Sequence, residues 1–141
     1  MRWFAVLVAL NACGEVPAPI YRDVPTVALT EDDERHVGEE KTLTAGVLNE
    51  QLFDAVKAGD ALHIINGFQG GTWVHISVRI TGMRSRGRIV ASLGEAVGET
   101  AFELKLIRTA QGFMEAHDIP IPVRGDIDDL IGRDVTLHIT Y

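Results

Sequence analysis

Residues 73–80 alternate between apolar and polar side chains, and this pattern constrains the fold more strongly than any other feature of the sequence. Successive side chains of a β-strand point to opposite faces, so strict alternation predicts a half-buried strand with Val74 and Ile80 on its buried face. The same period returns along the rest of the chain. Further strands are predicted at residues 25–29, 42–48, 61–65, 88–93, 102–107 and 135–141. A chain built from such runs folds mainly by pairing strands.

Turn-forming residues separate these runs, and no regular series of helices alternates with them. Residues 82–87 (Gly-Met-Arg-Ser-Arg-Gly) lie between two strand candidates and predict the turn of a β-hairpin. Residues 48–57 fit one short helix or a folded loop equally well, and residues 126–131 fit a single capped turn. Short strands without a βαβ rhythm predict an all-β fold, an antiparallel immunoglobulin-like β-sandwich with at most one or two short helical turns. Tyr141 ends the last strand and is expected to pack in the core.

Chain length and net charge limit the number of domains and the classes of partner that are expected. The 141 residues suit one domain, and 20 acidic against 13 basic side chains give a net charge of −7. Nucleic acids and anionic membrane surfaces repel such a chain, so no nucleic-acid partner is expected. The single cysteine, Cys13, excludes an internal disulfide and a multi-cysteine zinc site.

The N-terminus has the layout of an export signal. Arg2 precedes eight apolar residues at 3–10, and the small residue Ala12 follows them. A positive charge, a short apolar run and a small residue are typical of a secretory signal peptide, and the run is far shorter than the about 20 residues of a membrane span. The alternative is a soluble protein in which residues 3–10 form an ordinary strand of the sheet.

Leu10-Asn11-Ala12-Cys13 resembles the lipobox of bacterial lipoproteins. The resemblance implies that residues 1–12 are a signal peptide and that Cys13 is lipidated and becomes the new N-terminus. Lipid chains on this cysteine would hold the protein to a membrane. Because Gly14 rather than aspartate follows the cysteine, the sorting rule of this family implies the outer membrane of the cell envelope.

Residues 13–41 differ in composition from the remainder and predict a tether. Between residues 14 and 41 lie three of the five prolines and eight acidic side chains against three basic ones. Proline-containing segments of like charge stay extended and hold a domain away from a surface. The predicted organisation is a signal peptide at 1–12, the lipidated cysteine with its acidic tether at 13–41, and the β-sandwich domain at 42–141.

A glycine-rich stretch at residues 67–71 (Gly-Phe-Gln-Gly-Gly) lies within a segment that carries a second resemblance. Residues 46–82 are similar to a segment of the form F…GD-x-L…G-x-QGG-x-H in lipoproteins of predatory and social soil bacteria. That resemblance implies an immunoglobulin-like sandwich on a lipid anchor, and it carries no activity. A phosphate-binding loop would need a following Gly-Lys-Ser/Thr, so the stretch instead predicts a turn that uses the conformational freedom of glycine.

Arg84, Arg86 and Arg88 are the best candidates for contact with a partner. Arginine side chains on a loop pair with carboxylate or phosphate groups, including those of lipids or sugars near the outer membrane. We therefore expect the loops at 82–87 and 67–71 to contact an envelope protein or a glycan. The alternative is a solvated loop whose positive charge offsets the acidic remainder.

Histidines supply an alternative function. His63, His75 and His138 would form a copper or zinc site if their strands adjoin, since imidazoles from neighbouring strands are common ligands of both metals. Without a closely spaced histidine pair, exposed surface histidines are the preferred interpretation, and no cofactor is expected.

The sequence lacks the usual signs of a catalytic site. Ser77, Ser85 and Ser92 have no nucleophile-elbow context, and the scattered carboxylates do not predict a catalytic pair. An enzyme is therefore not expected. The sequence predicts a lipid-anchored envelope lipoprotein whose non-catalytic β-sandwich binds another envelope component or has a structural role.

Overall fold

The chain folds into strands joined by turns in a computed structural model that describes residues 3–11, 26–27, 40–50, 52–67, 70–94 and 98–141. The strands are β1 (Trp3–Asn11), β2 (Thr26–Val27), β3 (Thr42–Asn49), β4 (Leu52–Ala55), β5 (Ala61–Asn66), β6 (Thr72–Thr81), β7 (Arg86–Leu93), β8 (Gly98–Lys105), β9 (Ile107–Thr109), β10 (Met114–Pro122) and β11 (Asp134–Thr140). This content confirms the prediction of an all-β fold. Within the described part of the chain, no helix has the length and apolar character needed to cross a membrane.

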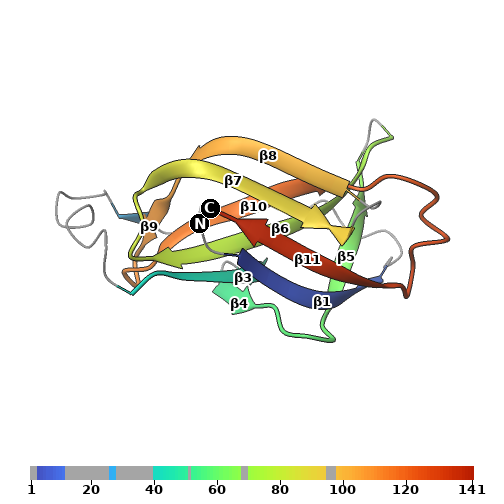
Figure 1. Cartoon of the computed structure of the whole chain (residues 1–141), viewed down its shortest axis with the longest axis horizontal. Helices are drawn as coiled ribbons and strands as arrows, with labels where there is room; N and C mark the ends of the chain where they lie inside the picture. The colour runs from blue at the N-terminus through green and yellow to red at the C-terminus, as the bar shows by residue number, and fades with distance from the viewer. Residues whose placement is uncertain (1–2, 12–25, 28–39, 51, 68–69, 95–97) are drawn as a thin grey trace.

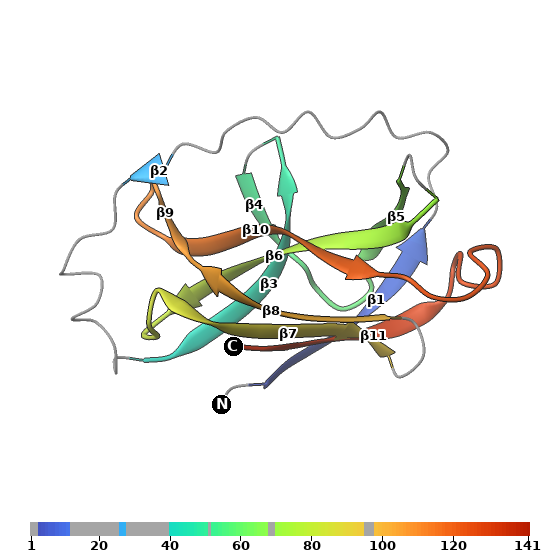
Figure 2. The same cartoon turned by 90° about the horizontal axis from the view of Figure 1, so that it is seen from above.

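The strands form one continuous, curled sheet whose two halves face each other (Figures 1 and 2). The hydrogen-bonded order is β2-β9-β10-β6-β5-β1-β11-β7-β8, with β3 paired to β6 and β4 paired to β3. We call β1, β11, β7 and β8 layer A, and β2, β9, β10, β6, β5, β3 and β4 layer B. Figure 2 shows β7, β8 and β11 on one side of the molecule and β6 and β10 on the other.

Strand β1 joins the two layers. It pairs antiparallel with β11, from Trp3 opposite Thr140 to Ala9 opposite Asp134, and parallel with β5 over three residue pairs. The parallel pair makes the sheet mixed, so the expectation of a wholly antiparallel arrangement is wrong at this strand. The immunoglobulin-like arrangement stays a prediction.

The inward face of β1 belongs to the core. Val8 and Leu10 are completely buried. This is the arrangement that the alternative interpretation of residues 3–10, an ordinary strand of the sheet, requires. Cys13 and most of the predicted tether at 13–41 lie outside the described residues, and the removal of a signal peptide stays a prediction.

The alternation of residues 73–80 describes β6 correctly. Its inward side chains are at most 1% exposed, and they share one core cluster with the inward side chains of β7 and β11 in layer A. These core residues include Val74, Ile76, Val78 and Ile80 on β6, Ile89 and Leu93 on β7, and Leu137 and Ile139 on β11. The core therefore lies between the layers, and the outward face of each layer is available for other contacts.

Residues 48–57 form a β-hairpin rather than a short helix. Strands β3 and β4 pair with Leu48 opposite Phe53, and Glu50 takes φ = 47° in the connecting turn. An isolated helix of about ten residues is marginal in water, whereas β3 finds stable backbone partners along β6. The long-range pairing of residues 42–46 with β6 therefore extends β3 into this segment, and the local β3–β4 hairpin replaces the helical turn.

Residues 82–85 cross from layer B to layer A and do not form the predicted hairpin turn. Strand β6 pairs with β3, β5 and β10, whereas β7 pairs with β8 and β11, so the strands on either side of the turn are not neighbours. Gly82 takes φ = 64°, and the hydroxyl of Tyr141 donates to the carbonyl of Arg84 at 2.8 Å. Tyr141 also packs against the core, as expected.

The described glycines of the stretch at 67–71 are hydrogen-bonded as a turn, and residues 68 and 69 lie outside the described residues. The amide of Gly67 donates to the carbonyl of Gly71 at 2.7 Å, and the amide of Gly70, at φ = 83°, donates to the carbonyl of Gly67 at 3.0 Å. The indole of Trp73 lies against Gly67 and Gly71, where any Cβ would collide with the ring. The glycines therefore serve the close packing of an aromatic side chain.

Residues 126–131 form the predicted capped turn. The carboxylate of Asp126 accepts a hydrogen bond from the amide of Asp128 at 3.0 Å, and the amide of Leu130 donates to the carbonyl of Ile127 at 2.9 Å. Aspartate commonly closes such turns because its short side chain reaches the backbone two residues later.

Candidate functional site

The outward face of layer B carries a row of polar side chains. On β6, Trp73, His75, Ser77 and Arg79 point away from the core, and Glu115 of the neighbouring strand β10 lies opposite Arg79. The period of residues 114–122 did not predict a strand, so the contribution of β10 to this polar face is visible only in the structure.

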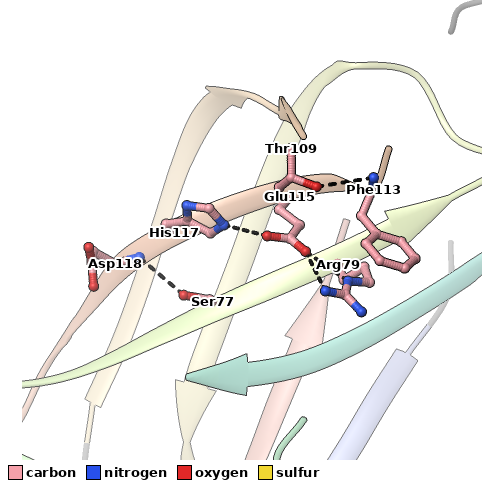
Figure 3. A network of polar contacts seen from close by, with 7 residues as sticks. All are labelled: Ser77, Arg79, Thr109, Phe113, Glu115, His117 and Asp118. Atoms are coloured by element: carbon pink, nitrogen blue, oxygen red, sulfur yellow. Dashed lines mark hydrogen bonds and ion pairs between the residues drawn. The ribbon is translucent and has the colours of Figure 1, made fainter. Parts of the chain in front are cut away.

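A β-bulge in β10 brings two further polar side chains to this face. His117 and Asp118 both lie opposite Ser77, because the pairing shifts between Ala116 and Ile119. Asp118 takes φ = 53°, a left-handed conformation that aspartate tolerates better than most residues. Its amide donates to Ser77 Oγ at 3.4 Å (Figure 3). Bulges re-aim side chains in this way, and they are frequent beside functional sites.

A pocket of about 430 Å³ opens on this face, between β6, β5, the bulge and the β3–β4 hairpin. The polar residues that line it are Asn49, Asp54, His63, His75, Ser77 and Asp118, and the apolar ones are Val47, Leu48, Ala61 and Ile65. Strand pairing thus brings His63 and His75 together. The volume lies within the range of small-molecule sites, about 300–1,000 Å³.

Burial lowers the pKa of His75 below its ordinary value of 6.5, and the nearby carboxylate of Asp118 opposes this shift. His75 Nδ1 lies 4.0 Å from Asp118 Oδ1. Because desolvation is the larger cause, the imidazole is neutral at pH 7. The described contacts include no hydrogen bond between the Ser77 hydroxyl and this imidazole, so the three residues do not form the hydrogen-bonded chain of a hydrolytic triad.

His75 is expected to make the protein less stable as the pH falls. The unfolded chain takes up a proton at His75 near pH 6.5, whereas the lowered pKa delays this step in the folded chain. The unfolded state therefore binds more protons below about pH 6.5, and the free energy of unfolding decreases until the pH passes the folded pKa. The loss in Tm between about pH 7.5 and 5 should be smaller for His75→Gln than for the wild type. The exposed His138→Gln is the control, and equal losses in all three proteins would contradict the expectation.

Glu115 forms the centre of a buried charge cluster beside the pocket (Figure 3). Its side chain is 4% exposed, and Oε1 accepts from Arg79 Nε at 2.8 Å and lies 2.7 Å from Nη2. The other oxygen, Oε2, is hydrogen-bonded to His117 Nε2. The guanidinium of Arg79 lies between the rings of Phe53 and Phe113, 4.4 and 3.7 Å from their centroids. Since every charge has a partner, its burial is compensated, and the cluster links β4, β6 and the β9–β10 hairpin.

Local sequence explains how the two rings reach Arg79. Gly46 lies beneath Phe53, where a Cβ would collide with the ring. Phe113 is held by Thr109, whose amide donates to its carbonyl at 2.9 Å and whose Oγ1 accepts from its amide at 3.2 Å. A small residue and a closed turn therefore position the two aromatic walls of the cluster.

The three predicted contact arginines lie on the opposite side of the molecule. Arg84, Arg86 and Arg88 are exposed, the last two on the outward face of β7 in layer A. Lys105 of β8 lies opposite Arg86, and Glu103 lies opposite Arg88. We call Arg84, Arg86, Arg88 and Lys105 the basic row. Like charges directly opposite each other destabilise a sheet, and Glu103, diagonal to Arg86, offsets only part of the Arg86–Lys105 repulsion.

His138 does not join the other two histidines of the predicted metal site. It lies on β11 in layer A, in a second pocket of about 860 Å³ that Arg124 and Arg133 also line. The core between the layers separates it from His63 and His75. Among the residues that the structure describes, no three His, Cys, Asp or Glu side chains are grouped so that they could hold a metal ion.

Glu115, Asp118 and Lys105 were not predicted as site residues from the sequence. Pro120, Pro122 and the bulge interrupt the period of β10, and the position of Lys105 matters only through the register of β8 with β7. The one local sign of a buried charge was an acidic residue, Glu115, directly between two apolar residues.

Comparisons of the chain with protein-family models, with curated proteins and with solved structures find no match. The residues and their geometry are therefore the basis for assigning a function.

Proposed function

We propose that this chain is a lipid-anchored lipoprotein of the outer membrane whose non-catalytic β-domain binds an anionic envelope component through the basic row. The lipobox-like residues 10–13 support the anchor. The observation that carries the binding function is Arg86 opposite Lys105, two like charges kept together on an acidic chain. An anionic group between them would turn their repulsion into two attractions. Glu103, opposite Arg88, offsets one charge of the basic row. More distant acidic side chains are screened from the row, because the Debye length is only about 8 Å at physiological ionic strength.

A phosphorylated glycan is the partner that best fits the basic row. Guanidinium groups bind phosphate oxygens through two parallel hydrogen bonds, which lysine cannot do. Alternate residues of a strand lie about 7 Å apart, since the rise is about 3.3 Å per residue. Arg86 and Arg88 therefore present two cations at a spacing that suits a ligand with several phosphate groups.

The anchor requires that β1 be removed with the signal peptide, and the pattern of strand pairing tolerates this loss. Strand β1 is the end strand of layer A, and its backbone pairs with layer B at only three residue pairs, all with β5. All other strand pairings would persist without it. The single curled sheet would become two facing sheets, which is the sandwich that the sequence predicts.

The intact mass of the protein tests the anchor. We expect protein extracted with detergent from the membranes of a lipidating host to have the mass of the chain from Cys13 plus acyl groups. Cys13→Ala should remain unacylated and leave the membrane fraction. A full-length, unacylated wild-type protein in the soluble fraction would contradict the anchor.

Replacing Arg84, Arg86 and Arg88 with alanine should weaken binding to vesicles that carry a phosphorylated glycolipid in phosphatidylcholine. Each basic residue near an anionic surface contributes about 1 kcal/mol, so the expected loss is about 3 kcal/mol, or roughly a hundredfold in Kd. Cosedimentation of the full chain with Cys13→Ser measures this difference without any contribution from the lipid.

A matched control removes the same charge elsewhere. Lys57, Arg124 and Arg133 are exposed and lie outside the basic row, so their replacement with alanine should change binding much less. Unchanged binding of the first triple variant, or an equal loss in both variants, would exclude the basic row as the contact surface.

A further inference from the structure

The pocket on layer B differs in chemistry from the basic row on layer A. Its lining holds the carboxylates of Asp54 and Asp118 and, among the described residues, no lysine or arginine. The described contacts give the Asp118 carboxylate no hydrogen-bond donor, since His75 Nδ1 lies 4.0 Å away. The pocket therefore presents negative charge that no described side chain neutralises.

Ser77 supplies a second, independent feature of the pocket. The residue is only 1% exposed, yet it lines this cavity. Its Oγ accepts from the amide of Asp118 at 3.4 Å, and its hydroxyl proton has no acceptor among the described residues. Burial of an unsatisfied donor is costly. A ligand oxygen in the pocket would accept this proton.

The remaining lining suits a small organic molecule. His75 adds no positive charge at pH 7, because burial lowers its pKa. Val47, Leu48 and Ile65 provide an apolar wall for a carbon skeleton. The volume of about 430 Å³ is adequate for a ligand of monosaccharide size.

We propose that this pocket binds a small amino alcohol, a molecule in which an ammonium group stands next to a hydroxyl group. The ammonium group pairs with Asp118 and Asp54, and the neighbouring hydroxyl oxygen accepts the proton of Ser77. Amino sugars and linear amino alcohols share this chemistry. The assignment depends neither on the lipid anchor nor on the basic row.

Isothermal titration calorimetry of the full chain tests the ligand class. We expect saturable binding of glucosamine and at least tenfold weaker binding of N-acetylglucosamine, which keeps the ring but lacks the charge. Ethanolamine distinguishes the two sources. Equal binding of ethanolamine assigns the site to the amino alcohol group alone, and preference for glucosamine assigns it to an amino sugar. Absence of saturable binding of both amines, or equal binding of the acetylated sugar, would overturn the proposal.

Variants of the pocket test the residues. Asp118→Asn should weaken glucosamine binding at least tenfold, and asparagine tolerates the left-handed backbone at this position. Ser77→Ala should weaken binding severalfold. Asp128→Asn, at an exposed aspartate on the turn at 126–131, should leave the Kd within twofold of wild type.

A cooperative thermal unfolding transition shows that a variant is folded. If Asp118→Asn is not folded, Asp54→Asn takes its place. Wild-type affinity in both aspartate variants would overturn the proposal. The triple variant of Arg84, Arg86 and Arg88 should bind glucosamine like the wild type, so a failure of the basic row and a failure of the pocket are observed separately.

Discussion

A chain that begins at Cys13, with Cys13→Ser, is expected to stay folded but to lose about 3–6 kcal/mol of its free energy of unfolding. Val8 and Leu10 are completely buried, and full burial of such a side chain contributes about 1.5–3 kcal/mol. The shorter chain also loses the backbone hydrogen bonds of Leu10 with Arg133 and Gly132, at 3.1 and 2.6 Å. Urea unfolding of the two chains measures the difference.

The outcome separates the two interpretations of the N-terminus. An unfolded shorter chain would contradict the lipoprotein proposal, because the mature protein lacks β1. Equal stability of the two chains would mean that residues 3–11 are not part of the fold.

Two single substitutions in the full chain are the controls for this experiment. Leu10→Ala should cost about 2–5 kcal/mol because it leaves a cavity in the core. Ala5→Ser lies on the exposed side of the same strand and should change stability by less than about 0.5 kcal/mol. A neutral Leu10→Ala would show that β1 does not contribute to the core.

Arg79→Met is expected to lower the free energy of unfolding by about 3–5 kcal/mol. The substitution keeps much of the apolar contact with Phe53 and Phe113. Among the described residues, it leaves the buried carboxylate of Glu115 with His117 as its one remaining partner. An uncompensated buried charge accounts for a loss of this size. Chemical denaturation of the variant measures the change.

The double variant Arg79→Met/Glu115→Met identifies the cause of this loss. If the loss comes from the Glu115 carboxylate that has lost its ion-pair partner, removal of both charges restores most of the stability. Apolar replacements of a buried ion pair are often neutral. Arg124→Met, at an exposed position, is the control and should be close to neutral. A double variant that is no more stable than Arg79→Met would show that the unpaired carboxylate is not the cause of the loss.

The alternation of apolar and polar residues was sufficient to predict β3, β5, β6, β7 and β11. A strand with one buried face carries apolar side chains on that face, so its own sequence shows the pattern. Strand β10 escaped prediction for a physical reason. Pro120 and Pro122 lack amide protons, and His117 and Asp118 form a bulge that breaks the period. Over this part of β10, the described residues pair on one side only, with β6, which is the edge position where prolines are tolerated.

Spatial neighbours of each strand were decided by the tertiary structure. Residues 82–85 have the composition of a hairpin turn, yet they connect two layers. The helical spacing of residues 48–57 gave way to the β3–β4 hairpin, whose first strand is held by the pairing of residues 42–46 with β6. In both segments the local signal was real, and contacts between distant residues outweighed it because they bury more of the chain.

The candidate sites divide in the same way. The sequence by itself grouped Arg84, Arg86 and Arg88 near one predicted turn, and only the structure showed that Arg86 and Arg88 are alternate residues of β7 and share one face. Only the tertiary structure paired Arg79 with Glu115 and placed His138 away from the other two histidines of the predicted metal site. Such pairings depend on the register between distant strands, and register is selected when the apolar faces of both layers pack together. Local sequence sets the face on which a side chain lies, and the packing of the layers selects its neighbours.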